Sequence, residues 1–350
     1  MRNLLFLYRW LLAVRGWHQR SKVLNSKGFT LMELLISLVV ASMVVSGLLY
    51  VVVELTTIDK REANLDQVQR DMNRAMDYIV DDLQEAVYVY PNPQFIANQL
   101  SLDSAFPNGA GNVPVLAFWR IDPVETNLPN CTVGSDSFKR ACSLLEIRQA
   151  VYTLVVYVQK KNDGTNRNWP GQSRIIRYDL KMYRGSLADL KSTNPTLALR
   201  SGYRDPANST DLLASFEGWQ KGDGDPAGNS DVLVDYVQAP TFDTPVALNR
   251  PPLSDAGGAC RGFGVVGSTP LYSIVPSTAT TTVNNSFFAC VRDPTVALAA
   301  SRGNQDVYVF LRGNVQGVSG GVRGFSNEAS LPILESQVLV KGVVNKSFSQ

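Results

Sequence analysis

The longest apolar stretch of the chain runs from Phe29 to Val53 and contains a single charged side chain, Glu33. An apolar stretch of about 18 or more residues is long enough to cross a bilayer as a helix. A charge inside such a segment costs about 2.5 kcal/mol or more unless it finds a partner. The pattern therefore predicts a transmembrane helix over 29–53 with one carboxylate that needs a cation.

Beyond Glu54 apolar side chains recur at spacings of three and four, which is typical of one face of an amphipathic helix. They are Leu65, Val68, Met72, Ala75, Met76, Ile79, Leu83, Ala86 and Val87. No proline interrupts 29–90, and Pro91 and Pro93 are expected to end the helix. The sequence thus predicts one long helix over 29–89, transmembrane over 29–53 and amphipathic over 54–89. We expect its second half to pack on a sheet formed by the rest of the chain, with a coiled-coil partner as the alternative.

Residues 90–350 have the pattern of a β domain, in which runs rich in Val, Ile, Tyr and Phe alternate with clusters of turn residues. A long-looped hairpin is indicated by Asp163-Gly164, and a short helix by 210–220. A bulge or bend is expected within the long apolar run 144–159. The fold class predicted is α+β, a long helix followed by one β-rich domain. Its expected strands are 113–119, 144–159, 174–183, 232–237, 307–312 and 337–344.

The first 28 residues form a separate basic segment without any Asp or Glu. A secretory signal places its basic region first, then an apolar core, then the cleavage site. Here the basic residues and Gly28 come directly before the apolar core, so a cut after Gly28 would leave that core at the new N-terminus. We interpret 1–28 as a leader, with a surface-lying amphipathic segment at 4–14 as the alternative. By the positive-inside rule the leader stays in the cytoplasm and the remainder is exported. The basic residues are Arg2, Arg9, Arg15, Arg20, Lys22 and Lys27.

Residues 27–35, Lys-Gly-Phe-Thr-Leu-Met-Glu-Leu-Leu, resemble the class III signal of type IV prepilins and type II secretion pseudopilins. The resemblance implies cleavage after Gly28 by prepilin peptidase and N-methylation of the new N-terminal Phe29. It also implies that Glu33 pairs with the N-terminal amine of a neighbouring subunit in a filament. A buried carboxylate and a buried ammonium are each costly alone and are tolerated as a pair. An ordinary membrane anchor with an incidental Glu is the alternative.

Further segments resemble the cyanobacterial pseudopilins associated with hormogonium polysaccharide secretion, and larger minor pilins generally. The resemblance implies a role in polysaccharide export, in twitching motility or in both. One departure from major pilins is the absence of a proline late in the apolar segment, where this chain has Tyr50. The similar segments are 61–62, 76–79, 82–90, 114–120 and 174–178.

Removing the leader changes the charge balance and the available chemistry. Six of the 33 Lys and Arg residues lie in 1–28, so the mature chain has 27 basic against 31 acidic residues, a net charge of −4. This balance disfavours nucleic-acid binding. The only histidine, His18, is also in the leader, which excludes His-based triads, bases and metal ligands from the mature chain. Without a nucleophile elbow or a phosphate loop, we expect no enzyme; a paired-carboxylate glycosidase is the alternative that sequence leaves open.

Four cysteines, Cys131, Cys142, Cys260 and Cys290, all follow the apolar segment. An even number in an oxidising compartment favours disulfides, although three pairings are possible. The sequence-local pairing is Cys131–Cys142 and Cys260–Cys290. A zinc site made by all four is the alternative, which the lack of a closely spaced Cys-x-x-Cys pair disfavours.

One loop partly matches a calcium-binding pattern, with oxygen ligands at four positions and Gly228 at the sixth. Ala227 at position 5 and Val234 at position 12 lack the required oxygens, so a solvated turn is favoured and no cofactor is expected. Trp169 and Trp219 lie beside Pro and Gly turns and are either sugar platforms or core residues. The four oxygen-bearing residues are Asp223, Asp225, Asn229 and Asp231.

These expectations together describe a minor pilin or pseudopilin whose work is assembly. Its expected partners are prepilin peptidase, other pilins through the N-terminal helix, and the inner membrane, with polysaccharide as a candidate ligand. The expected location is the inner membrane, with a single span and an exported C-terminal domain that reaches the cell surface in a filament. The alternative function is a membrane-tethered adhesin or polysaccharide-binding module.

Overall fold

The computed structural model describes residues 29–342 except 110, 125–130, 133–135, 165–167, 184–198, 208–211, 240–259, 261–262, 264, 267–268, 277–285, 295, 297–304 and 316–329. The chain divides into two compact units, Met1–Ile58 and Asp59–Gln350. We call the second unit the β domain and describe each unit by itself.

The long helix α2 spans Leu31–Gln84 and contributes to both units. Thr30 caps its N-terminus, since its Oγ1 accepts a hydrogen bond of 3.3 Å from the Glu33 N–H. Every residue of 31–58 is exposed. The hydroxyls of this half donate to helix carbonyls instead of needing water, as an apolar solvent requires; they belong to Ser37, Ser42, Ser46, Thr56 and Thr57.

The prediction that the helix continues to residue 89 is wrong. The helix ends at Gln84, and Ala86–Val89 form strand β1. All four residues of β1 are buried, because one side of the strand faces α2 and the other faces a second core. Ala86 and Val87 fitted the helical spacing by chance, since two consecutive apolar residues satisfy either period.

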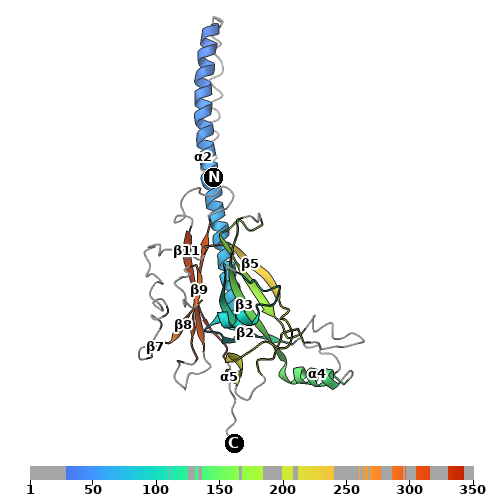
Figure 1. The fold of residues 1–350 in the computed structure, drawn as a ribbon. Coiled ribbons are helices and arrows are strands. Elements are labelled where there is room, and N and C mark those ends of the chain that lie inside the picture. Colours follow the sequence, from blue (N-terminus) through green and yellow to red (C-terminus); the bar gives the residue numbers. More distant parts are fainter. Residues whose placement is uncertain are drawn as a thin grey trace, which may run out of the picture. The chain divides into compact units, whose positions relative to one another are not determined.

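The strands of the β domain form an antiparallel sheet in two sections (Figure 1). In the first, each strand pairs with the next in sequence: β1, β2 (Asn112–Pro123), β3 (Ala150–Lys161), β4 (Ser173–Leu180) and β5 (Asn229–Val237). The second consists of β8 (Tyr272–Val275), β9 (Phe287–Arg292), β10 (Asp306–Asn314) and β11 (Ser330–Leu339). A single residue pair, Gly313 with Val237, joins the two sections. A separate small hairpin contains β6 (Val265–Val266) and β7 (Thr269–Pro270).

The second half of α2 packs on one face of both sections, as predicted, and the sheet takes the place of a coiled-coil partner. Strand alternation directs Leu116 and Phe118 of β2 toward this helix. Gly313 of β10 makes room for it, since a Cβ there would lie 2.9 Å from Met72 Cγ. The buried apolar residues of the helix are Val68, Met72, Ala75, Met76, Ile79 and Leu83.

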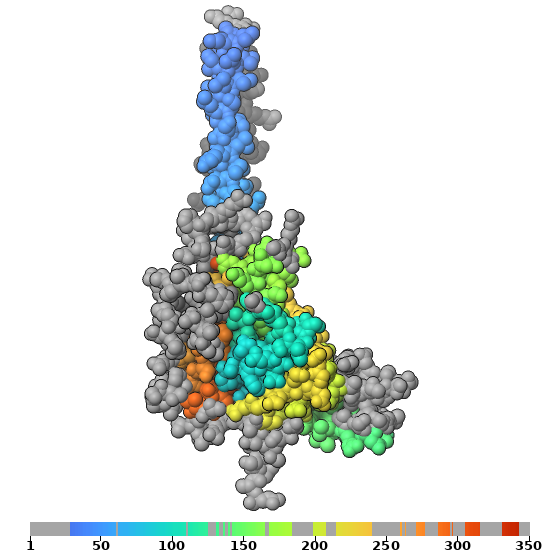
Figure 2. Space-filling model, viewed as in Figure 1, coloured from blue at the N-terminus to red at the C-terminus, as the bar shows by residue number. Residues whose placement is uncertain are grey.

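The other face of the first section carries a second core, to which Ala117 and Trp119 of β2 belong. Helices α3 (Pro93–Gln99) and α5 (Leu212–Glu217) cover it. The indole N–H of Trp119 donates to Tyr90 Oη at 2.9 Å, and Tyr90 donates to the Phe216 carbonyl at 2.7 Å. In Figure 2 the segment around α3, in blue-green, and the residues that precede β5, in yellow, lie side by side over this face.

The expected strand over 144–159 is correct only in its second part. Residues Leu144–Arg148 belong to helix α4 (Asp136–Arg148), and Gln149, with a φ of 51°, separates it from β3. The expected bulge lies instead in β2, where Val115 is the extra residue opposite Val158 and Tyr157 of β3. The other expected strands correspond to β2, β4, β5 and β10 and to the end of β11, and the expected short helix corresponds to α5.

Candidate assembly site and the polar network of the β domain

The N-terminal signal residues lie at the start of α2. Gly28 lies outside the described residues. Phe29 is 77 % exposed, and Glu33 occupies the first turn of the helix, also exposed. Within the described part of the chain the Glu33 carboxylate has no cationic partner, and 29–53 contains no Lys or Arg that could supply one. Glu33 is therefore an acid on an apolar helix that still needs a positive charge.

The same half of α2 presents large apolar side chains on every side, from Leu31 to Ile58. Among the described residues α2 is the one helix that is long and apolar enough to cross a membrane. Such a surface requires either lipid or the apolar faces of other helices.

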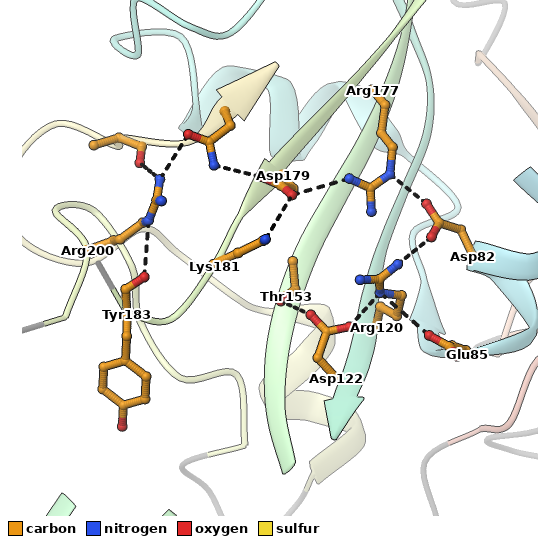
Figure 3. A network of polar contacts seen from close by, with 12 residues as sticks. Asp82, Glu85, Arg120, Asp122, Thr153, Arg177, Asp179, Lys181, Tyr183 and Arg200 are labelled. Atoms are coloured by element: carbon orange, nitrogen blue, oxygen red, sulfur yellow. Dashed lines mark hydrogen bonds and ion pairs between the residues drawn. The ribbon is translucent and has the colours of Figure 1, made fainter. Parts of the chain in front are cut away.

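At the other end of α2, Asp82 is the centre of a buried polar network that sequence analysis missed (Figure 3). Its side chain is 5 % exposed. Oδ1 accepts from Arg120 of β2 at 2.5 Å, and Oδ2 accepts from Arg177 of β4 at 2.7 Å and from the Tyr157 hydroxyl of β3 at 2.6 Å. One carboxylate thus ties the end of the helix to three adjacent strands.

The two arginines of the network are themselves held by further acids. Arg120 Nε donates to Asp122 at 2.7 Å, and Arg177 Nη1 donates to Asp179 at 3.2 Å. Burial lowers the pKa of Arg177, but the hydrogen bond and charge of Asp82 outweigh it and raise that pKa above its ordinary value. Burial and the Asp82 carboxylate together raise the pKa of the Tyr157 hydroxyl well above its usual range. At neutral pH Arg177 therefore stays charged and Tyr157 stays neutral. The network acts as a structural lock.

A signal for this lock was present in the sequence. Arg120 directly follows the buried apolar run 115–119 of β2, and Arg177 lies between the buried Ile176 and Tyr178 of β4. A cation beside a buried surface needs an acid nearby. Asp82 could not be distinguished from the neighbouring acids of the segment predicted as amphipathic helix, Asp77, Asp81 and Glu85.

The structure does not bring the calcium-loop candidates together as ligands. The Asn229 side chain donates to Asp179 at 3.2 Å and accepts from Arg200 at 3.4 Å, so its oxygen already faces a cation. Asp223 lies in the loop before β5, and Asp225 and Asp231 are exposed. Within the described ranges no group of three or more His, Cys, Asp or Glu is arranged to hold a metal.

The cysteines form the two sequence-local pairs. The Cys131–Cys142 disulfide links the segment before α4 to that helix, and both residues form a small cluster of their own. The Cys260–Cys290 disulfide packs among Tyr272, Phe288 and Phe310 on β8, β9 and β10.

The two tryptophans considered as sugar platforms differ. Trp219 is a core residue, 2 % exposed, whose indole N–H donates to the Arg204 carbonyl at 2.9 Å. Trp169 lies in the β3–β4 connection, is partly exposed, and stacks with the Arg174 guanidinium, whose Cζ is 5.2 Å from the ring centroid.

Comparison with known proteins gives a result only for the N-terminal segment. Residues 24–49 match the family model of the prokaryotic N-terminal methylation motif. No curated protein and no solved structure matches the chain. The matched residues include the proposed cleavage site, Phe29 and Glu33. The N-terminal segment of this chain is therefore similar to the class III signal of type IV pilins.

Proposed function

We propose that this protein is a minor pilin or pseudopilin that is cut after Gly28, methylated at Phe29 and assembled into a type IV pilus-like filament. The observation that carries the proposal is the methylation motif at 24–49 followed at once by a helix whose first half is uncovered and apolar. The work of the protein in this account is assembly and not catalysis.

The exposed first half of α2, residues 31–58, fits a helix that moves from the membrane into a filament during assembly. Before assembly, lipid would surround 29–53, with the leader in the cytoplasm and the β domain exported. After extraction the same side chains would need another apolar environment, which the helices of neighbouring subunits supply.

Glu33 supports the same account through its charge. The segment 29–58 contains only two charged side chains, Glu33 and Glu54, and neither is basic. The cation that processing creates on this segment is the N-terminal amine of Phe29. In a bundle of such helices the amine of one subunit and Glu33 of another would neutralise each other, which makes burial of both tolerable.

The segments that resemble pseudopilins of polysaccharide secretion support a role in a filament for polysaccharide secretion or motility. They are 61–62, 76–79, 82–90, 114–120 and 174–178. A tethered polysaccharide-binding module is a second candidate function, favoured by the partly exposed Trp169 with its stacked arginine.

Glu33→Gln tests the assembly role, with Glu54→Gln as the matched control on the same exposed helix surface. We expect the Glu33 variant to be processed and to remain in the membrane, while its amount in sheared filaments falls at least about tenfold. One unpaired charge of a buried pair costs about 3–5 kcal/mol, and 1.4 kcal/mol is a tenfold change. Immunoblots of the membrane and sheared fractions measure this ratio. Equal incorporation of both variants and the unsubstituted chain would contradict the proposed role.

A further inference from the structure

A groove of about 430 Å³ lies on the β domain between the second half of α2 and strand β5. Three aromatic residues line it: Tyr78 of α2, Trp169 of the β3–β4 connection and Tyr236 of β5. Asp71, Arg74 and Asp235 provide polar groups beside them. A pocket of this size, lined mostly by apolar and aromatic residues with a few polar groups, is the usual form of a small-ligand site.

Two of the rings are held in place by guanidinium groups. The Arg177 Cζ lies 5.8 Å from the centroid of Tyr78, and the Arg174 Cζ lies 5.2 Å from that of Trp169. Each arginine is fixed in turn: Arg177 binds Asp82, and Arg174 donates to the Asn162 side chain. Tyr78 nevertheless remains 46 % exposed. Ring and cation attract each other through the ring quadrupole, so these rings keep a fixed orientation while still facing solvent.

The third ring belongs to a strained residue. Tyr236 has a φ of 60°, and it follows Asp235 in a β-bulge, where two residues of β5 oppose Arg174 of β4. Gly171 lies directly under the bulge, since a Cβ there would be 2.5 Å from Tyr236 N. Bulges next to binding sites redirect side chains, and strained residues cluster at ligand sites. The fold thus places an aromatic side chain in the groove at a conformational cost.

The Asp235 carboxylate of the groove is fixed by two hydrogen bonds. Asp235 Oδ1 accepts from the Asn162 amide at 2.8 Å, and Oδ2 accepts from the Gly171 N–H at 3.1 Å. Each carboxylate oxygen can accept a further hydrogen bond. Arg74 and Asp71 at the rim, 3.9 Å apart, add donors and acceptors.

The charges around the groove select among ligand classes. Asp71 and Asp235 disfavour a phosphate polymer, while Arg74 and the arginines behind the two rings disfavour a cation. A neutral ligand with flat C–H faces and many hydroxyls fits both the rings and the polar groups. We propose that this groove binds a neutral segment of polysaccharide, with sugar rings against Tyr78, Trp169 and Tyr236 and hydroxyls at Asp71, Arg74 and Asp235. The site deepens the proposed function but needs only an exported β domain, so it holds or fails independently of the Glu33 test.

The tryptophans of the mature chain allow a direct test. It has three, of which Trp119 is 0 % and Trp219 2 % exposed, so iodide quenching of fluorescence reports mainly on Trp169. We would purify the processed full-length chain in lauryldimethylamine oxide, a surfactant without sugar or tryptophan. The probes are cellohexaose and mannohexaose as neutral oligosaccharides and hexagalacturonate as an anionic one.

We expect a neutral hexasaccharide to protect Trp169 from iodide in a saturable manner. Tyr78→Ala should raise the dissociation constant about tenfold, equivalent to about 1.4 kcal/mol, whereas Tyr78→Phe keeps the ring and should retain binding. Leu339→Ala, an exposed apolar residue on β11, serves as the surface control and should leave binding unchanged.

Three results would overturn the proposal. The first is no protection by any of the three probes while circular dichroism shows a folded chain. The second is protection by hexagalacturonate alone, which would assign an anion site. The third is protection that rises with protein concentration without any sugar, which would assign the groove to contact between copies of this chain.

Discussion

Asp82 shows how a single residue can fix the join between a helix and a sheet. Its carboxylate accepts from two arginines and a tyrosine that lie on three different strands. Removing the acid would take the shared buried partner from two guanidinium groups, leaving Arg120 with Asp122 and Arg177 with Asp179. Loss of one partner of a buried ion pair is among the most costly defects in a protein.

We therefore expect Asp82→Asn to reduce the free energy of unfolding by about 3–5 kcal/mol. Asp81→Asn, the exposed neighbour on the same helix turn, is the matched control and should change it by at most about 0.5 kcal/mol. Urea unfolding of the processed chain, followed by tryptophan fluorescence to which the buried Trp119 and Trp219 contribute, measures both. Similar small losses for the two variants would show that the network does not lock the helix to the sheet.

At this scale Glu33 could be singled out from sequence, because it is the only charged residue of the apolar run 29–53 and needs a cationic partner. Asp82 could not, because it is one acid among many on an amphipathic helix. The strain at Tyr236 has no sequence signal either, since its positive φ depends on the close approach of Gly171.

At the scale of elements, the second half of α2 was predictable because its apolar residues repeat at helical spacing. Of the seven expected residues within the helix, six are buried and Leu65 is partly buried. Helix α4 was missed because Leu144, Leu145 and Ile147 run directly into the β-branched residues of β3. Short apolar runs do not distinguish helix from strand, and only Gln149, with its positive φ, marks the boundary.

The two disulfides should differ in their contribution to stability. Cys260 and Cys290 are completely buried against aromatic residues of three strands and close a segment of 30 residues. Replacing both by Ala should lower the free energy of unfolding by about 2–4 kcal/mol.

Replacing Cys131 and Cys142 by Ala should act locally instead, because that pair forms its own cluster outside the two large cores. We expect faster amide exchange in α4 with little change in β2, β3 and β4. Denaturant unfolding measures the change in global stability for each pair of substitutions, and hydrogen exchange measures the local change in α4. Equal global losses for the two pairs would contradict this division.

For the molecule as a whole, the β domain is built around one sheet that is covered on both faces. Alternation along strands such as β2 supplies both cores, and the α+β class follows from this pattern. The contact between β5 and β10 through one residue pair could not be predicted, because it joins segments far apart in sequence and has no local signal. The features of the first unit could be predicted from local sequence, since its motif and its exposed apolar residues lie in one continuous stretch of the chain.

The measurement that tests the central claim most directly is the N-terminus and mass of the protein recovered from its own cells, beside a Gly28→Val variant. The account predicts a mature chain that begins at N-methylated Phe29, and a variant that keeps its leader and Met1. An unprocessed Met1 start in the unsubstituted chain, or a cut beyond Val53, would contradict processing as a pilin and remove the basis for assembly through Glu33.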